Sequence, residues 1–216
     1  MGSQCANAMP LVFGLVPSDQ RERVLASLVN DVQTHGLTTG DVGYRYLLRA
    51  LADAGRSDII FTLNNQSEKP GYGYQLAHGA TSLTEAWDAG YRSSQDHFML
   101  GQIMEWFYHD LAGIGLDPAA PGFKHIIIRP QLAGDITWAR ADYESLRGRI
   151  HSAWNLEAGQ LVLEVEIPVG ATATVFVPAV DPVEVKAPAG AMPLPAEPGY
   201  AVFAVGSGFY QFTRVE

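Results

Sequence analysis

A ten-residue segment, GATSLTEAWD at residues 79–88, places a carboxylate beside an aromatic side chain. Glu85 lies between small polar residues and Trp87, in a predicted loop that Gly79 and Gly90 bound. An indole ring packs well against a sugar face, and it raises the pKa of a nearby carboxyl by excluding water. A carboxylate beside an aromatic residue is therefore typical of a glycosidase site. The alternative is a surface loop in which Trp87 fills the core.

A second segment, SQDHFMLG at residues 94–101, places Asp96 and His97 at the start of a predicted long helix. The helix dipole favours a carboxylate at this end, and His97 points towards whatever the N-terminus of the helix faces. The alternative for His97 is a capping or core histidine.

A third segment, LTTGDVG at residues 37–43, turns from one predicted helix into the next. Thr38, Thr39 and Asp41 could hydrogen-bond a polyol through their side-chain oxygen atoms. The alternative is a cluster that caps the second helix, and this role suits Asp41 in particular.

Metal-binding residue types also occur, at His35, Asp41, His78, Asp96, His97, His109 and Asp110. His97 and His109 are 12 residues apart, which places them about 120° apart around a helix, and the chain has no HExxH motif. We therefore expect no metal and no cofactor. The chain also lacks the GxSxG, P-loop and GxGxxG motifs, which argues against serine-hydrolase and nucleotide-binding functions.

The charge balance restricts the partners. The 216 residues include 14 Lys and Arg against 23 Asp and Glu, a formal net charge of −9, which disfavours nucleic acid and anionic lipid. No apolar run approaches the roughly 18 residues that a membrane span needs. The first residues lack a basic region and a long apolar stretch, so we expect no signal peptide and take the cytoplasm as the default location. The single cysteine, Cys5, excludes an internal disulfide.

The first half of the chain has apolar residues at helical spacing. Helices are predicted over residues 18–36, with Ser18 as the cap, over 41–55, from 57 to 63, and from about 93 to Gly113. The predicted buried stripe of the last helix is His97, Leu100, Met104, Phe107 and Leu111. The long connection over residues 68–92 is of a length that usually has a function.

Beyond the Pro/Gly hinge LDPAAPG at residues 116–122, the pattern alternates with period 2. In the clearest strand the apolar residues Leu161, Leu163, Val165 and Ile167 share one face. About seven short strands separated by turn signals predict an antiparallel β-sandwich, with a long Pro-rich loop over 178–198. The other six are predicted over 125–129, 138–143, 148–155, 171–177, 201–205 and 209–214. The chain thus divides into a mainly α region, residues 1–117, and an all-β region, residues 118–216.

The helical region holds too few amphipathic helices to cover its own apolar stripes. So few helices form at most an arc or a small bundle, and the chain starts as if inside a helix. We expect a preceding part to be missing and the exposed apolar surface to be covered in a homodimer.

Four stretches resemble, in order and spacing, the C-terminal part of bacterial α-L-rhamnosidases: residues 37–58, 71–89, 93–114 and 121–154. These enzymes are inverting glycoside hydrolases with an (α/α)6 barrel followed by a β-sandwich. The resemblance covers nearly the whole chain. It implies that residues 1–117 are a truncated α/α-barrel domain and that residues 118–216 are the C-terminal β-sandwich domain.

The resemblance also implies roles for individual residues. The Glu of the GATxxxExW segment is the general base of the family, which corresponds to Glu85, and the His of the xxHFMLG segment contacts the sugar, which corresponds to His97. The substrate-binding residues that we predict around them are Trp87, Asp96, Thr39, Asp41 and Tyr74. Tyr74 belongs to PGYGY (70–74), where the family usually has a Trp just after Pro-Ser, so the sugar subsite is expected to differ.

An inverting reaction also needs a carboxylic acid roughly 6.5–9.5 Å from the base. The family's acid lies well upstream, and nothing in this chain matches it. We therefore expect hydrolysis of a rhamnoside or another small saccharide only if a partner supplies the acid. Two alternatives stay open. One is a promiscuous hydrolase of activated, phosphate or sulfate esters, in an opened cleft lined by Glu85, Trp87, Tyr91, His97 and Trp106; the other is a non-catalytic carbohydrate-binding module.

Overall fold

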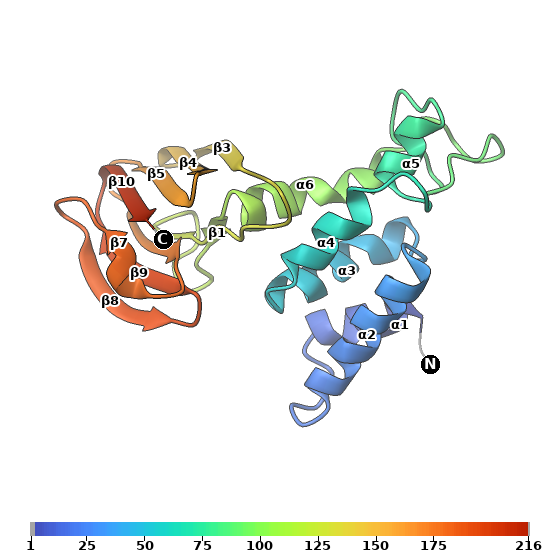
Figure 1. Ribbon diagram of the computed structural model, residues 1–216, viewed down its shortest axis with the longest axis horizontal. Coiled ribbons are helices and arrows are strands. Elements are labelled where there is room, and N and C mark those ends of the chain that lie inside the picture. The colour runs from blue at the N-terminus through green and yellow to red at the C-terminus, as the bar shows by residue number, and fades with distance from the viewer. Residues whose placement is uncertain (1–2, 216) are drawn as a thin grey trace. The chain divides into compact units, whose positions relative to one another are not determined.

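The computed structural model describes residues 3–215 and divides the chain into two compact units, Met1–Trp106 and Phe107–Glu216 (Figure 1). The first unit is helical, and the second consists mainly of β-strands. This confirms the predicted fold class, a helical region followed by largely antiparallel sheets. No helix among the described residues has both the length and the apolar character needed to cross a membrane.

The helices of the first unit form where apolar residues recur at helical spacing. They are α1 (Gln4–Val12), α2 (Arg21–His35), α3 (Asp41–Asp53), α4 (Ser57–Asn64), α5 (Tyr72–Ala77), the 3₁₀ helix η1 (Phe98–Gln102) and α6 (Ile103–Trp106). The clearest case is α3, in which Tyr44, Leu47, Leu48 and Leu51 are all buried. The predicted long connection is interrupted only by the short helix α5.

The predicted Ser18 cap is wrong. The helix α2 begins at Arg21, after Gln20, and no side chain caps it. The reason is a turn over the preceding residues, in which the Gln20 N–H donates to the Pro17 carbonyl at 2.9 Å. Leu28, in the predicted stripe of this helix, is fully buried.

The last predicted helix is shorter and less regular than its apolar pattern indicates. It begins at Phe98 as a 3₁₀ helix, is α-helical only over Ile103–Trp106, and continues in the second unit as a π-helix, η2 (Phe107–Leu111). Because each helix type has a different number of residues per turn, the predicted stripe does not stay on one face. Met104 and Phe107 are exposed, contrary to the prediction, whereas Leu100 and Leu111 are buried.

The second unit contains two five-stranded sheets, in the orders β1-β2-β6-β9-β8 and β3-β4-β5-β10-β7. Neighbouring strands are antiparallel except for β2 and β6, which are parallel. The strands are β1 (Ile114–Leu116), β2 (His125–Ile128), β3 (Trp138–Ser145), β4 (Gly148–Glu157), β5 (Gln160–Ile167), β6 (Thr172–Pro178), β7 (Val185–Lys186), β8 (Met192–Glu197), β9 (Tyr200–Val205) and β10 (Gly208–Val215). The predicted boundary between residues 117 and 118 lies between β1 and β2, inside this unit.

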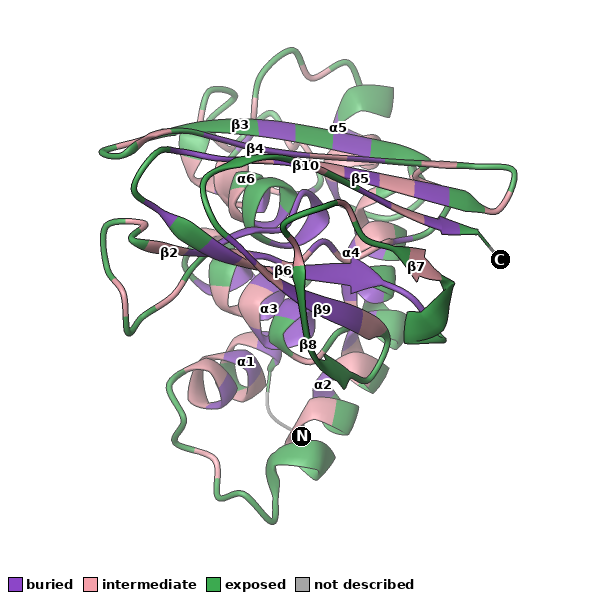
Figure 2. Cartoon of the chain, turned by 90° about the vertical axis from the view of Figure 1, so that its left-hand side faces the viewer, coloured by how far each residue is buried: buried purple, intermediate pink, exposed green. Residues whose placement is uncertain are grey.

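The core of the second unit follows the predicted alternation. Along β5, the residues Leu161, Leu163, Val165 and Ile167 are buried while their neighbours are partly or fully exposed, and Figure 2 shows the buried residues alternating along the strands. The buried Trp154 of β4 donates its indole N–H to the Leu111 carbonyl at 2.7 Å. The stretch before β1 is thus hydrogen-bonded to the sheet.

The Pro-rich stretch 178–198 is not the long loop that its composition indicates. It contains the two-residue strand β7 and the strand β8, which pairs with β9 at the edge of its sheet. Every residue of β8 is exposed, and two of them, Pro193 and Pro195, cannot donate a hydrogen bond to a neighbouring strand. The strand therefore lacks the apolar alternation that is typical of a predicted strand, and β1 and β7 were likewise not predicted.

A charged cluster lies on the strands β3, β4 and β5. The Asp142 carboxylate accepts hydrogen bonds from the His151 ring at 2.7 Å and from Arg149, and Arg149 also pairs with Glu166 at 3.2 Å. Desolvation opposes the ionised form of Asp142, but the hydrogen bonds from His151 and Arg149 outweigh it and lower its pKa to about 2. The folded state therefore holds this carboxylate ionised at a pH where an unfolded chain protonates it.

We predict that Asp142→Asn destabilises the second unit and reduces its sensitivity to acid. The depressed pKa means that the ionised carboxylate stabilises the fold above about pH 4 and loses this effect as the pH falls towards 2. The substitution should lower the free energy of unfolding at pH 7 by about 1 kcal/mol, because the group is partly exposed. Urea unfolding at pH 7, 4 and 3 measures this, with the exposed Asp135→Asn as control. An unchanged pH dependence in Asp142→Asn would contradict it.

Candidate active site

Two segments that carry the predicted catalytic residues run side by side in the first unit. The Glu85 N–H donates to the Ser94 carbonyl at 2.9 Å, and the His97 N–H donates to the Leu83 carbonyl at 2.7 Å. The Ser82 hydroxyl donates to the Gln95 carbonyl. These backbone contacts bring together the segments of Glu85 and His97, the two residues that the sequence analysis singled out.

The Glu85 carboxylate is exposed, but its position is restricted by the same pairing. Its Oε2 accepts a hydrogen bond from the Ser94 N–H at 3.0 Å. The preceding residue, Thr84, is fully buried, and its hydroxyl donates to the Ala86 carbonyl at 2.7 Å. The backbone on one side of Glu85 is therefore anchored in the core, while the residue itself is exposed to solvent.

Trp87 anchors the Glu85 loop from the other side. The residue is 7% exposed, and its ring packs edge-on against Tyr44 at 4.8 Å and Tyr72 at 5.2 Å between centroids. Its indole N–H donates to the Thr39 carbonyl at 2.7 Å. Thr39 is itself buried, and its hydroxyl donates to the Gly40 carbonyl. The hydrogen-bonding groups of Trp87 and Thr39 are thus engaged within the protein, and sugar binding by these two residues stays a prediction.

The phenols around Trp87 support the loop and are not acid–base groups at neutral pH. Burial raises the pKa of Tyr44 and of Tyr72 well above the usual phenol value. The Tyr44 hydroxyl lies 3.0 Å from the Asn64 side-chain oxygen, and the Tyr72 hydroxyl donates to the Leu100 carbonyl. Tyr72 was not among the predicted site residues, although the PGYGY motif contains it.

Asp41 and His97 approach each other through their side chains. The His97 Nε2 and the Asp41 Oδ2 are 3.5 Å apart, and both side chains are partly exposed. The alternative in which Asp41 caps α3 is wrong. The N-cap is Gly40, and Asp41 is the first residue of the helix. The Gln102 amide donates to the Asp41 backbone carbonyl at 2.6 Å, a contact for which the sequence offers no signal.

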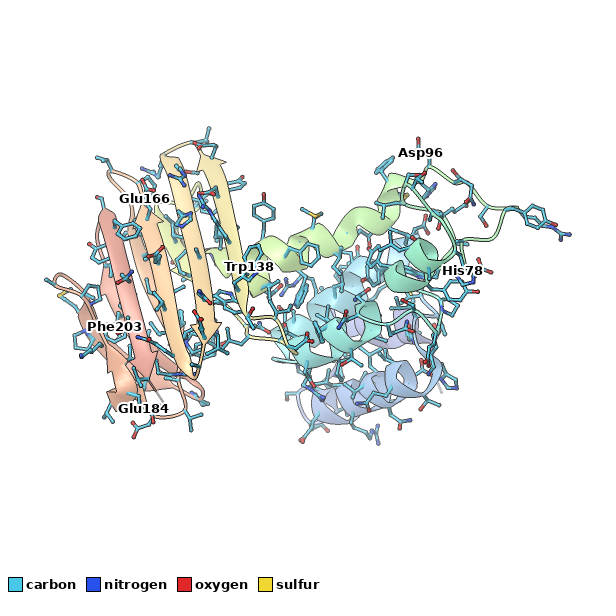
Figure 3. All side chains as sticks on the ribbon, turned by 45° about the horizontal axis from the view of Figure 1, so that its top comes forward. His78, Asp96, Trp138, Glu166, Glu184 and Phe203 are labelled. Carbon is cyan, nitrogen blue, oxygen red and sulfur yellow. The ribbon has the colours of Figure 1, made fainter. Side chains whose placement is uncertain are left out.

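The two remaining predicted sugar-binding residues lie on loops and on α5. Tyr74 stacks on His78 with centroids 3.8 Å apart, so one face of its ring is covered. Asp96 is exposed, and Figure 3 shows both His78 and Asp96 at the loop-rich end of the first unit. Contact of Tyr74 and Asp96 with a sugar stays a prediction.

The expected cleft is not lined as predicted. Trp106 is 3% exposed and donates its indole N–H to the Ser57 hydroxyl at 2.8 Å, so it belongs to the core together with Trp87. Tyr91, in contrast, is highly exposed. An open pocket of about 400 Å³ lies elsewhere in this unit, lined by Leu11, Ser18, Arg21, Glu22, Leu25, Ala50, Asp53 and Ala54. Among the described residues, no three His, Cys, Asp or Glu side chains are placed to share a metal ion.

Comparison with known proteins identifies the class of both units. Residues 1–111 match the bacterial alpha-L-rhamnosidase 6 hairpin glycosidase domain, and residues 115–191 match the bacterial alpha-L-rhamnosidase C-terminal domain. The chain therefore belongs to the bacterial α-L-rhamnosidase family, as its motifs predicted.

Individual relatives agree with this assignment. The α-L-rhamnosidase of Streptomyces avermitilis is 34% identical over 98% of this chain and 21% of its own length. The α-L-rhamnosidase of Alteromonas sp. is 31% identical over 82% of this chain and 20% of its own length. The crystal structure of the Streptomyces avermitilis enzyme complexed with L-rhamnose matches 97% of this chain with a TM-score of 0.90. The α-L-rhamnosidase from Dictyoglumus thermophilum, 28% identical, covers 100% of this chain and 26% of its own with a TM-score of 0.87. This chain thus spans about a fifth of the length of the curated relatives that it matches.

We predict that Trp87→Phe destabilises the first unit by about 1–3 kcal/mol. Phenylalanine retains a ring against Tyr44 and Tyr72 but leaves the buried Thr39 carbonyl without its donor. Urea unfolding followed by far-UV circular dichroism measures the change. The control is Tyr91→Phe at the exposed end of the same loop, which should leave the transition unchanged. Equal stability of the two variants would show that the indole N–H bond does not stabilise the loop.

Proposed function

We propose that this chain supplies the general-base side of an α-L-rhamnosidase active site. Glu85 is the base and His97 contacts the sugar. The observation that carries the proposal is the pairing of residues 82–85 with residues 94–97, which fixes an exposed carboxylate next to the segment of the histidine. Family membership supports the substrate class, because the relatives are named α-L-rhamnosidases and one of them is complexed with L-rhamnose.

The proposed step is a single displacement. Glu85 accepts a proton from a water molecule, and the water oxygen bonds to the anomeric carbon of the rhamnoside. The bond between that carbon and the leaving oxygen breaks at the same time, and a carboxylic acid donates a proton to the leaving oxygen. The product is a rhamnose of inverted anomeric configuration.

The acid is proposed to come from outside residues 1–216. None of the carboxylates singled out here matches the position of the family's acid. Inversion requires the acid roughly 6.5–9.5 Å from Glu85, on the opposite side of the sugar. Turnover therefore depends on a partner polypeptide that completes the site, while Glu85 and His97 remain on this chain.

A chimera tests the role of Glu85. Residues 1–216 replace the matched region of the Streptomyces avermitilis α-L-rhamnosidase, so that the rest of that enzyme is present in the same polypeptide. We expect this chimera to hydrolyse p-nitrophenyl α-L-rhamnoside, to release the inverted anomer first by proton NMR, and to lose about 10²- to 10⁴-fold in kcat on Glu85→Gln. The chain alone should show no turnover.

The control is Glu68→Gln, which neutralises an exposed glutamate of the same unit and should leave kcat unchanged. Full activity of the Glu85→Gln chimera would overturn the assignment. Turnover of aryl, phosphate or sulfate esters by the chain alone would favour the promiscuous hydrolase, and calorimetric binding of L-rhamnose without any turnover in the chimera would favour a carbohydrate-binding module.

We also propose that the chain forms a homodimer through the helical unit. Several large apolar side chains of this unit are exposed, among them Phe13, Leu15, Val42 and Leu76. Burying them between two copies removes apolar area from water, and a two-fold arrangement covers both copies equally.

Light scattering at micromolar concentration should give twice the chain mass of 23.4 kDa. Leu15→Lys should shift the sample towards the monomer, because it places a charge in the apolar surface, whereas Val169→Lys in the second unit should not. A monodisperse wild-type monomer would exclude the dimer.

A further inference from the structure

We propose that Asp41 is a positioning residue, which orients the His97 imidazole towards the sugar and does not contact the sugar itself. This role depends on the proposed function of His97. It differs from the polyol contact that the sequence predicts for Asp41. The contacts around the Asp41 and His97 side chains support it.

The first observation is the environment of the His97 ring. Its Nε2 is shielded from solvent and makes no hydrogen bond among the described residues, and the Asp41 Oδ2 lies 3.5 Å away. A shielded ring nitrogen needs a partner, because an unpaired polar atom in the interior is unfavourable. The Asp41 carboxylate places an acceptor at this position. Hydrogen bonds of catalytic sites are often long without substrate and tighten in the complex.

The second observation is that the two carboxylate oxygens of Asp41 have different neighbours. Its Oδ1 accepts a hydrogen bond from the Val42 N–H at 2.9 Å, at the N-terminus of α3. This bond restricts the rotation of the carboxylate. The Oδ2 is then the oxygen that remains for the His97 ring.

The third observation is that the backbones of both residues are held by separate bonds. The His97 N–H donates to the Leu83 carbonyl, and the Gln102 amide donates to the Asp41 carbonyl at 2.6 Å. Gln102 closes the 3₁₀ helix that starts directly after His97. Separate hydrogen bonds therefore fix the backbone of each residue, and the two side chains approach to 3.5 Å between these fixed points.

The chemical consequence is a fixed tautomer. An ionised carboxylate can only accept, so the neutral His97 ring carries its proton on Nε2, towards Asp41. Its Nδ1 then presents a lone pair and accepts a hydrogen bond from a sugar hydroxyl. Without Asp41, either nitrogen can carry the proton, and the preference for a hydroxyl donor is lost.

The test is the tautomer of His97 in the complete chain, measured by long-range proton–nitrogen NMR at pH 8.5, above the usual titration range of histidine. The His97 signals are assigned by their absence in His97→Gln. We expect the proton on Nε2 in the wild type. In Asp41→Asn, the amide oxygen keeps the bond to Val42 and the amide N–H₂ faces the ring, so the proton should move to Nδ1.

The matched control is Asp53→Asn, at the opposite end of the same helix, where Asp53 pairs with Arg49 at 2.6 Å. It should retain the wild-type tautomer. A proton on Nδ1 in the wild type, or an unchanged tautomer in folded Asp41→Asn, overturns the inference. If Asp41→Asn does not fold, the wild-type spectrum alone decides between the two tautomers.

The chimera separates this inference from the proposed function. Asp41→Asn in the chimera should lower kcat/KM about tenfold, the equivalent of one hydrogen bond, with a larger effect on KM than on kcat. Loss of activity in Glu85→Gln with an unchanged His97 tautomer in Asp41→Asn would contradict only the role of Asp41. A shifted tautomer with full activity in Glu85→Gln would contradict only the role of Glu85.

Discussion

The hydrogen bond from the Trp87 indole to the Thr39 carbonyl is the constraint on which the helical unit depends. It joins the turn before α3 to the loop that carries Glu85, and both partners are buried. A second bond, from the Thr39 N–H to the Gln4 amide oxygen, extends the connection to α1. Three segments that are distant in the sequence are thereby held in one place, so the aromatic ring that looks like a sugar platform acts as an internal anchor.

This anchoring explains how an exposed loop can hold the Glu85 carboxylate in a restricted position. Loops at the surface are usually mobile, because few buried contacts restrain them. Here the residues on both sides of the exposed Glu85 are held: Thr84 is buried, and Trp87 is fixed by its ring and its N–H. The core thus restricts the backbone, while the Glu85 side chain keeps its contact with solvent.

The sequence predicts the elements better than the site. Regular alternation identified β5 because one face of a strand is buried and the other is not, whereas β8 has no buried face and therefore no such pattern. The motif containing Glu85 and the one containing His97 were recognisable from residue types. Their pairing was not, because every hydrogen bond described in it uses at least one backbone group, which leaves no trace in the side-chain pattern. The contact of Gln102 with Asp41 is undetectable for the same reason, since its acceptor is a carbonyl.

The same pairing has a consequence for the loop that it closes. Residues 88–93 lie between the Trp87 anchor and the Ser94 contact, and Tyr91 at their tip is highly exposed. Lengthening a surface loop whose ends are already held together costs little free energy, because the closure entropy grows only with the logarithm of its length. Changes of length or sequence at this tip are therefore compatible with an unchanged pairing between the segments of Glu85 and His97.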